Sequence, residues 1–221
     1  MPPKPKYSRE EIINAAYELT RERGIDAVVA REVGKRLNTS SSPIFTVWNS
    51  MDELKDEVLS LAKQKYREYM ADIFDYAPAF KEFGMRWVSF AAEEPNLYRL
   101  LFLPDRDMNS PYIRFKREFE GILTPLVEEI QKNFDLSPED AEDLFNQMAI
   151  FANGLAAFVI TDRDSFSQED VSRSISRVCI GIVIEDKLRD STIDINAAKV
   201  MAQFAEKGIV PKKKYDKEKG D

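Results

Sequence analysis

The sequence contains no histidine among its 221 residues. This absence removes the commonest general base, the commonest metal ligand and every Ser-His or Cys-His nucleophile arrangement. Neither a GxGxxG sequence nor a P-loop sequence is present to hold a nucleotide cofactor. We therefore expect no catalytic residue, no metal and no cofactor, and we predict that the protein is not an enzyme.

Cysteine and long hydrophobic runs are also scarce. Cys179 is the only cysteine, so no internal disulfide can form. The longest nearly uncharged apolar run, residues 148–160, has 13 residues, short of the roughly 20 that span a bilayer. The first residues lack the apolar segment of a secretory signal. We therefore expect a cytoplasmic protein without a membrane partner.

An excess of positive charge is missing too. The chain carries 32 Lys and Arg against 39 Asp and Glu, a formal net charge of −7. The distribution is uneven, because residues 1–48 hold eight basic and six acidic side chains. Binding to a nucleic acid depends on local charge, so the N-terminal part stays compatible with a DNA partner. Residues 209–221 are dense in mixed charges, and we expect this tail to be disordered.

A helix-start signal does recur along the chain. Ser8, Ser50, Ser137 and Ser167 are each followed three residues later by an acid. The hydroxyl can accept from a free N–H of the first turn, and the acid lies at the positive end of the helix dipole. Sustained alternation typical of strands occurs only at residues 178–184, inside a longer helical pattern. The sequence therefore predicts an all-α fold.

Apolar periodicity and turn residues indicate where the helices begin and end. Three short helices are expected over 9–23, 30–37 and 41–48, with Gly24 as a left-handed stop after the first. A long helix should follow Ser50 before Pro78 interrupts. Further helices are expected at 79–94, 96–103, 111–133, 138–162, 168–188 and 195–207. We predict an N-terminal helix-turn-helix domain over 1–50, a larger helical domain over 51–208 and the charged tail over 209–221.

Residues 30–48 have the arrangement of a helix-turn-helix. Asn38 tolerates the left-handed backbone of a tight turn, and Gly34 would allow the next helix to approach closely. The segment that follows is uncharged, which suits a DNA major groove, because hydroxyls can bond to base edges and apolar groups can contact thymine methyls. The candidate DNA-binding residues are Thr39, Ser40, Ser41, Ser42, Pro43, Thr46, Val47, Lys35, Arg36, Lys6 and Lys55. Spacings of one, three and four residues place Ile44, Phe45 and Trp48 together as local core.

Residues 12–54 resemble the N-terminal domain of the tetracycline-repressor (TetR) family of transcriptional regulators. The shared marks are Ile12-x-x-Ala15-Ala16-x-x-Leu19, Gly24, Arg31-Glu32-Val33-Gly34, Leu37, Ser40, Ile44-Phe45, Trp48, Ser50 and Leu54. The resemblance implies an all-α homodimer whose C-terminal domain binds a small molecule and whose N-terminal domains bind the two halves of a double-stranded DNA operator.

The sequence departs from the family at three positions. The family usually has a tyrosine where Phe45 stands and a lysine where Met51 stands, and both commonly contact phosphates. Neither substitute can donate a hydrogen bond, so we expect weak non-specific DNA affinity. The threonine that commonly caps the second helix is Val29 here.

The C-terminal part is rich in aromatic residues, most of which are expected in the core. A ligand cavity would be lined by some of them, with a few polar groups that fix orientation. The candidate ligand-binding residues are Trp87, Phe90, Tyr98, Phe119, Gln147, Phe151 and Asn153. Two later helices carry apolar stripes that favour self-association into a four-helix bundle, although both faces could instead serve the internal core. The candidate dimerisation residues are Leu155, Phe158, Val171, Ile175, Val178 and Ile182.

Three hypotheses follow. The leading one is a ligand-responsive, dimeric DNA-binding regulator, a repressor that an unknown small-molecule effector releases from its operator. The second is a helical module that binds a small molecule or a protein and has a weakened, non-DNA-binding head. The third is an enzyme that uses carboxylates of the helical body.

Overall fold

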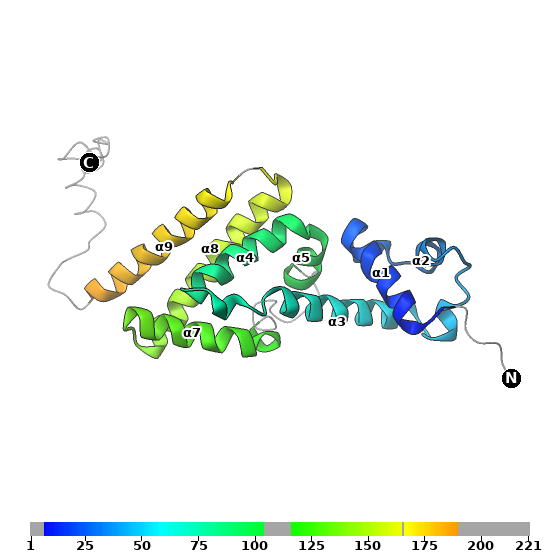
Figure 1. Ribbon diagram of the computed structural model, residues 1–221, viewed down its shortest axis with the longest axis horizontal. Coiled ribbons are helices and arrows are strands. Elements are labelled where there is room, and N and C mark those ends of the chain that lie inside the picture. Colours follow the sequence, from blue (N-terminus) through cyan, green and yellow to red (C-terminus); the bar gives the residue numbers. More distant parts are fainter. Residues whose placement is uncertain (1–6, 104–115, 165, 190–221) are drawn as a thin grey trace, which may run out of the picture. The chain divides into compact units, whose positions relative to one another are not determined.

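The computed structural model of the protein describes residues 7–103, 116–164 and 166–189. Within these ranges the regular structure is α-helix and short 3-10 helix, without a strand (Figure 1). The chain divides into two compact units, Met1–Ser176 and Arg177–Asp221, and the described part of the second is the C-terminal portion of helix α9. The predicted all-α class is confirmed. The domain limits at residues 50 and 208 remain predictions.

Helix α1 spans Arg9–Arg23, as predicted. Ser8 accepts a hydrogen bond from the Glu11 N–H, and the Glu11 carboxylate accepts one from the Ser8 N–H, which completes a capping box. The helix stops at Gly24, whose φ of 84° favours glycine. Its ψ of 165° is extended, so the predicted left-handed helical stop is wrong in detail.

Helix α2 spans Ala30–Arg36, and its N-cap residue Val29 makes no side-chain cap. Asn38 follows with a φ of 51°, so the predicted left-handed turn residue is confirmed. The turn comes back over Gly34, where a Cβ atom would lie 2.8 Å from the Ser40 carbonyl oxygen and 3.0 Å from that of Thr39. Glycine is therefore required at position 34 because the backbone comes very close there. The backbone that approaches it is that of the turn and not that of the predicted third helix.

The third α-helix predicted over 41–48 is wrong. The segment forms turns around a 3-10 helix, η2, at Ile44–Thr46. Pro43 has no N–H for a helical ladder, and the Thr46 hydroxyl donates to the Pro43 carbonyl oxygen at 2.7 Å. β-branched residues add to the low helix propensity of this stretch. We call residues 39–47 the reading segment.

The short 3-10 helix also changes which side chains are buried. Ile44 and Trp48 are 1% and 2% exposed, as expected for local core, but Phe45 is 53% exposed. At three residues per turn, neighbouring side chains point about 120° apart, so Phe45 cannot share the inward direction of Ile44. The prediction that Phe45 is core is therefore wrong.

Helix α3, Met51–Tyr69, starts at the cap Ser50 and runs from the N-terminal helices into the body of the first unit (Figure 1). Its inward face carries Leu54, Val58, Ala62 and Tyr66. The early part of the helix packs against α1. α3 is thus a single rigid element shared by the N-terminal helices and the body. It ends at Tyr69, and the short helix η3, Ile73–Asp75, precedes Pro78.

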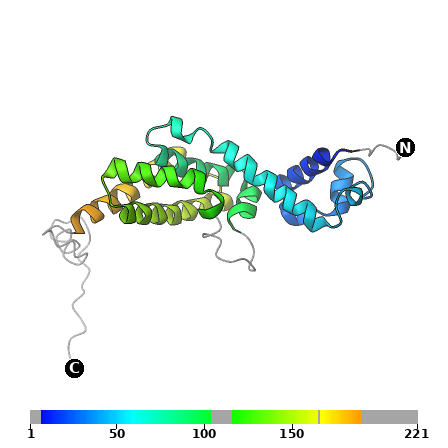
Figure 2. The same ribbon diagram turned by 90° about the horizontal axis from the view of Figure 1, so that it is seen from below.

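The body is built from α4 (Ala79–Glu93), α5 (Pro95–Phe102), α7 (Glu120–Phe134), α8 (Pro138–Thr161) and the start of α9 (Gln168–Arg189). α4 and α7 both pack along α8, as the two views show (Figures 1 and 2). α5 contacts α1, α3 and α4, so it joins the body to the N-terminal helices. The helix predicted over 111–133 lies partly outside the described residues. The helix predicted over 195–207 lies wholly outside them.

α8 has a buried side and an exposed apolar side. Ile150 and Phe158 are 72% and 60% exposed, and Gly154 and Ala157 lie between them on the same helix face. We call these four residues the α8 stripe. By length and composition α8 is also the one described helix that could cross a membrane, with a mean hydropathy of 1.5, but core helices of soluble proteins meet the same criterion.

The close approach at Gly34 leads to a stability prediction. Gly34→Ala should lower the free energy of unfolding by about 1–3 kcal/mol, because the added methyl group meets backbone carbonyl oxygens that cannot rotate away. Gly121→Ala is the matched control, since no atom lies within 4 Å of its added Cβ. Thermal unfolding followed by circular dichroism measures both. Equal stability of the two variants would contradict the close approach.

Candidate nucleic-acid interface

The reading segment presents an uncharged surface. Ser40, Ser42 and Thr46 are exposed, whereas Thr39, Ser41, Pro43 and Val47 are half-buried. No internal hydrogen bond involves the hydroxyls of Ser41 and Ser42 in the described structure, so both can bond to DNA. The Thr46 hydroxyl already donates its proton to the Pro43 carbonyl oxygen, so it can only accept a hydrogen bond from DNA.

The arginines near this segment are engaged in ion pairs. Each guanidinium meets a carboxylate from another helix or another turn, and these pairs join positions 9 to 73 residues apart. The pairs are Arg9–Glu57, Arg21–Glu94, Arg23–Glu32 and Arg36–Glu22. They orient the helices but neutralise the cations that a phosphate backbone would otherwise attract.

Arg36, a predicted DNA-binding residue, is one of the cations that an ion pair neutralises. Its two terminal nitrogens donate to the two carboxylate oxygens of Glu22 at 2.7 and 2.8 Å. This bidentate contact lowers the pKa of Glu22 and raises that of Arg36. Arg36 therefore ties the end of α2 to α1, a structural use that the sequence analysis did not foresee.

Arg31 and Lys35 on α2 and Lys55 near the start of α3 are exposed or half-buried cations that have no ion pair among the described residues. Lys35 and Lys55 were predicted as contacts, and Arg31 was missed. The position of Arg31 in the first turn of α2, two residues after the non-capping Val29, was the available signal. Lys6 lies outside the described residues.

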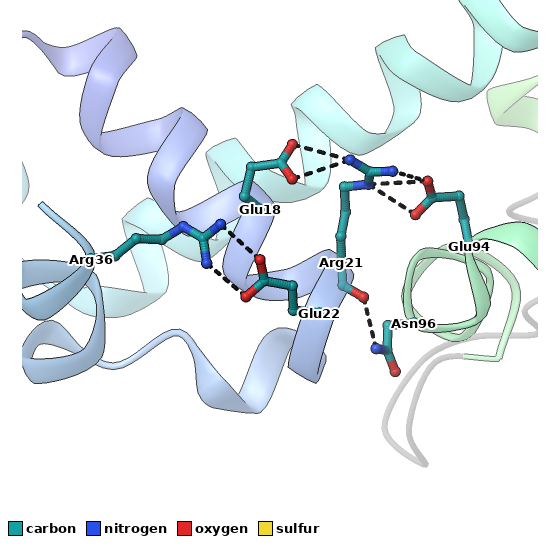
Figure 3. A network of polar contacts seen from close by, with 6 residues as sticks. All are labelled: Glu18, Arg21, Glu22, Arg36, Glu94 and Asn96. Carbon is teal, nitrogen blue, oxygen red and sulfur yellow. Dashed lines mark hydrogen bonds and ion pairs between the residues drawn. The ribbon is translucent and has the colours of Figure 1, made fainter.

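A clamp holds the end of α1 to the body (Figure 3). The Arg21 guanidinium forms a bidentate contact with Glu94, with Nε 2.9 Å from one carboxylate oxygen, and a second contact with Glu18 on its own helix at 3.1 Å. The Asn96 side-chain amide donates to the Arg21 carbonyl oxygen at 2.9 Å. Glu94 is the residue between α4 and α5, so the clamp joins the start of α5 to α1.

The clamp and the Arg36 pair are adjacent along α1. Arg21 faces the body, whereas the next residue, Glu22, faces α2 (Figure 3). Arg23 adds a second tie to α2 through Glu32, at 2.6 Å. The last turn of α1 is therefore the place where the body and the DNA-reading helices are connected by polar contacts.

In the body, a chain of hydrogen bonds links three candidate ligand-binding residues. The Trp87 indole N–H donates to the Tyr98 hydroxyl at 3.0 Å, and that hydroxyl donates to the Asn153 side-chain oxygen at 2.6 Å. The Asn153 amide donates in turn to the Ala149 carbonyl at 2.8 Å. The chain connects α4, α5 and α8. Burial places the pKa of Tyr98 well above its ordinary value.

The other four candidate ligand-binding residues lie apart from this chain. Phe90 and Phe119 are buried and face the ring of Tyr66, at centroid distances of 5.1 and 5.0 Å. Phe151 is half-buried on α8. Gln147 is exposed and bonds to Asp143 on the surface, so the structure does not bring it to the aromatic core.

A small apolar cavity lies next to the chain. It has a volume of about 20 Å³ and is lined from α4 by Phe83 and Trp87, from α8 by Met148 and Ala152, and by Ile175, among other apolar residues. In the described part of the chain, no group of three or more His, Cys, Asp or Glu side chains could hold a metal ion.

Of the predicted dimerisation residues, Leu155, Val171 and Ile175 are buried inside the protomer, and the Ile175 side chain reaches within 3.3 Å of the position that a Cβ of Gly84 would occupy. These three side chains therefore serve the internal core, the alternative noted from the sequence. Phe158 is exposed, and Val178 and Ile182 are half-buried.

The N-terminal geometry is that of a helix-turn-helix DNA-binding domain: a helix closed by a tight turn, followed by an exposed hydroxyl-bearing segment. Comparison with protein families gives a match over residues 12–58 to the bacterial regulatory proteins of the tetR family. Residues 12–58 are therefore similar to the helix-turn-helix domain of this family, which supports a DNA-binding transcriptional regulator, and a larger helical part follows this domain. No curated protein matches the chain. Regulators of this family are generally DNA-binding proteins without enzymatic activity.

The distinction between free and paired cations can be tested by salt dependence. Lys35→Ala should reduce the slope of log affinity against log salt concentration by about 0.9, because one phosphate contact is lost. Arg36→Ala should leave that slope nearly unchanged, since the Arg36 guanidinium is paired with the Glu22 carboxylate. Fluorescence anisotropy with a labelled duplex over a salt series measures both slopes. A larger change for Arg36→Ala than for Lys35→Ala would refute the assignment.

Proposed function

We propose that the protein is a ligand-responsive homodimeric repressor, which a small-molecule effector bound in the helical body releases from its operator. The observation that carries this proposal is the clamp at Arg21. Through it, the helix that holds Tyr98 in the body also holds the last turn of α1, which orients α2.

The connection is short enough to transmit a movement. A molecule that displaces Trp87 or Tyr98 shifts α5, an eight-residue helix whose first turn contains Asn96. Because Arg21 is bound by Glu94 and Asn96 at the start of α5, α1 follows α5. α2 then follows α1 through the Glu22–Arg36 pair. An effector can change the DNA-reading geometry only by binding the two arrangements with different affinities.

A homodimer supplies two reading segments to a palindromic operator. We propose that the α8 stripe forms the contact between protomers on this helix. Its two large side chains are exposed apolar surface, and nothing lies within 4 Å of a Cβ built at Gly154, so a second helix can approach closely. We place the protein in the cytoplasm, where its operator DNA is.

The alternative is a helical binding module whose head has lost most of its DNA affinity. It is favoured by the exposed Phe45, which cannot donate to a phosphate, and by the pairing of nearby arginines. Selection from a random duplex pool distinguishes the two functions. A repressor enriches a palindromic site, whereas the alternative module enriches no sequence.

The clamp can be tested with the selected operator. Glu94→Gln combined with Asn96→Ala should weaken binding to the two-half-site operator roughly threefold to fivefold, because the two heads are no longer held at a fixed separation. Binding to a duplex with one half-site should not change. Glu18→Gln is the matched control, since Glu18 contacts Arg21 only within α1. An equal loss on both duplexes would show that the clamp merely stabilises the head.

The proposed dimer contact at the α8 stripe can be tested by substitution of Phe158. Phe158→Glu should shift the protein from dimer to monomer in sedimentation velocity, because a carboxylate cannot be buried there without a partner. Phe74→Glu is the control, since Phe74 is also exposed, at 48%, but lies on η3. Dimers of unchanged stability in Phe158→Glu would exclude the α8 stripe as the contact.

A further inference from the structure

Tyr66 carries a polar group that the fold itself does not use. The residue is completely buried near the end of α3, and its hydroxyl has no hydrogen-bond partner among the residues that the structure describes. Buried hydroxyls are nearly always paired, because an unpaired one loses its bonds to water and gains nothing in return. The hydroxyl therefore needs an explanation beyond packing.

Four aromatic rings surround Tyr66 and leave its hydroxyl no conventional acceptor. Phe102 and Phe119 lie at centroid distances of 5.0 Å, Phe90 at 5.1 Å and Trp87 at 6.2 Å, all in edge-to-face geometry. We call Trp87, Phe90, Phe102 and Phe119 the aromatic cage. A phenylalanine at position 66 would fill the same space without an unpaired oxygen.

The groups that shift the pKa of Tyr66 are uncharged at neutral pH. Burial raises the pKa of Tyr66 well above its ordinary value, and Tyr98 and Tyr69 raise it further, without a carboxylate or a cation among the causes. The phenol is therefore protonated at neutral pH and offers one unused O–H donor. An ion would lose its hydration on entering this buried site.

Trp87 is shared by the cage and the small apolar cavity. The cavity of about 20 Å³ has room for about one water molecule, so a larger guest must move a wall. Trp87 lines this cavity, and its ring centroid lies 6.2 Å from that of Tyr66. The small residues Gly84, Ala149 and Ala152 also line the cavity.

We propose that Tyr66 is the hydrogen-bond donor of the effector site, and that the effector is a neutral aromatic molecule with a carbonyl-type acceptor. The molecule enlarges the cavity by displacing the Trp87 ring, stacks within the aromatic cage and accepts from the Tyr66 hydroxyl. This inference rests on the proposed ligand-responsive function and specifies its ligand. Displacement of Trp87 breaks its bond to Tyr98 on α5, the helix that reaches the clamp.

Three probe molecules of similar size test the class of ligand. Acetophenone is aromatic, neutral and carries a carbonyl, ethylbenzene lacks the carbonyl, and benzoate carries a charge. Isothermal titration calorimetry on the full-length protein should give an affinity for acetophenone about fivefold higher than for ethylbenzene, as expected for one hydrogen bond. Benzoate should bind more weakly than either.

The Tyr66→Phe variant separates binding from structure. It should bind ethylbenzene as the wild type does, lose the advantage of acetophenone, and melt at the same temperature as the wild type or higher, because an unpaired buried oxygen is removed. Tyr69→Phe is the control, since Tyr69 is half-buried on the same helix and its ring lies 5.4 Å from Phe90. It should change neither affinity.

Three results would overturn the inference. They are a lower melting temperature of Tyr66→Phe, an acetophenone advantage that survives this substitution, and no binding of either neutral probe up to its solubility. Operator release is measured separately, by anisotropy of the labelled duplex. Tyr66-dependent binding without release would refute the ligand-responsive function alone, whereas operator specificity and dimerisation without probe binding would refute this site alone.

Discussion

The last turn of α1 is the constraint on which the rest of the first unit depends. Arg21 is bound there by Glu94 and Asn96 from the start of α5, while the neighbouring Glu22 binds Arg36 of α2. The DNA-reading helices are short and have little core of their own, so their orientation relative to the body needs contacts beyond the shared helix α3. Three consecutive polar residues, Arg21 to Arg23, supply them. Each contact is an ion pair or a hydrogen bond with strict geometry, so together they fix the orientation of α1 and α2 relative to α5.

This arrangement has an electrostatic consequence. Guanidinium groups that hold helices together are not available to phosphates, so the head presents few free cations despite its arginines. What remains at the reading segment is a set of hydroxyls and small apolar groups, which discriminate bases through short-range contacts. In the proposed dimer, such N-terminal helices depend on the fixed separation of two copies more than on bulk attraction to the polyanion. The exposed Phe45 fits this balance, because it adds apolar contact without charge.

Tyr66 and Tyr98 are two buried tyrosines of the aromatic body that differ in their hydrogen bonds. The Tyr98 hydroxyl accepts a hydrogen bond from Trp87 and donates one to Asn153, so it is part of a chain of hydrogen bonds across three helices. Tyr66 lies beside it with an unpaired hydroxyl. A core selected only for stability would place phenylalanine at position 66. The contrast between the two residues is the physical reason that the proposed effector site is placed at Tyr66 and not at the surface around Gln147.

The sequence by itself determined the elements whose causes are local. The serine caps at positions 8, 50, 137 and 167 each bond to an N–H three residues away, and Asn38 and Gly34 act within a single turn. It could not determine the 3-10 geometry at Ile44–Thr46, the exposure of Phe45 or the pairing of Arg36, because these depend on how α1, α2 and α3 pack together. The clamp joins residues 73 positions apart. Such contacts are decided by tertiary structure, since no spacing along the chain brings Arg21 and Glu94 together until the helices around them have folded.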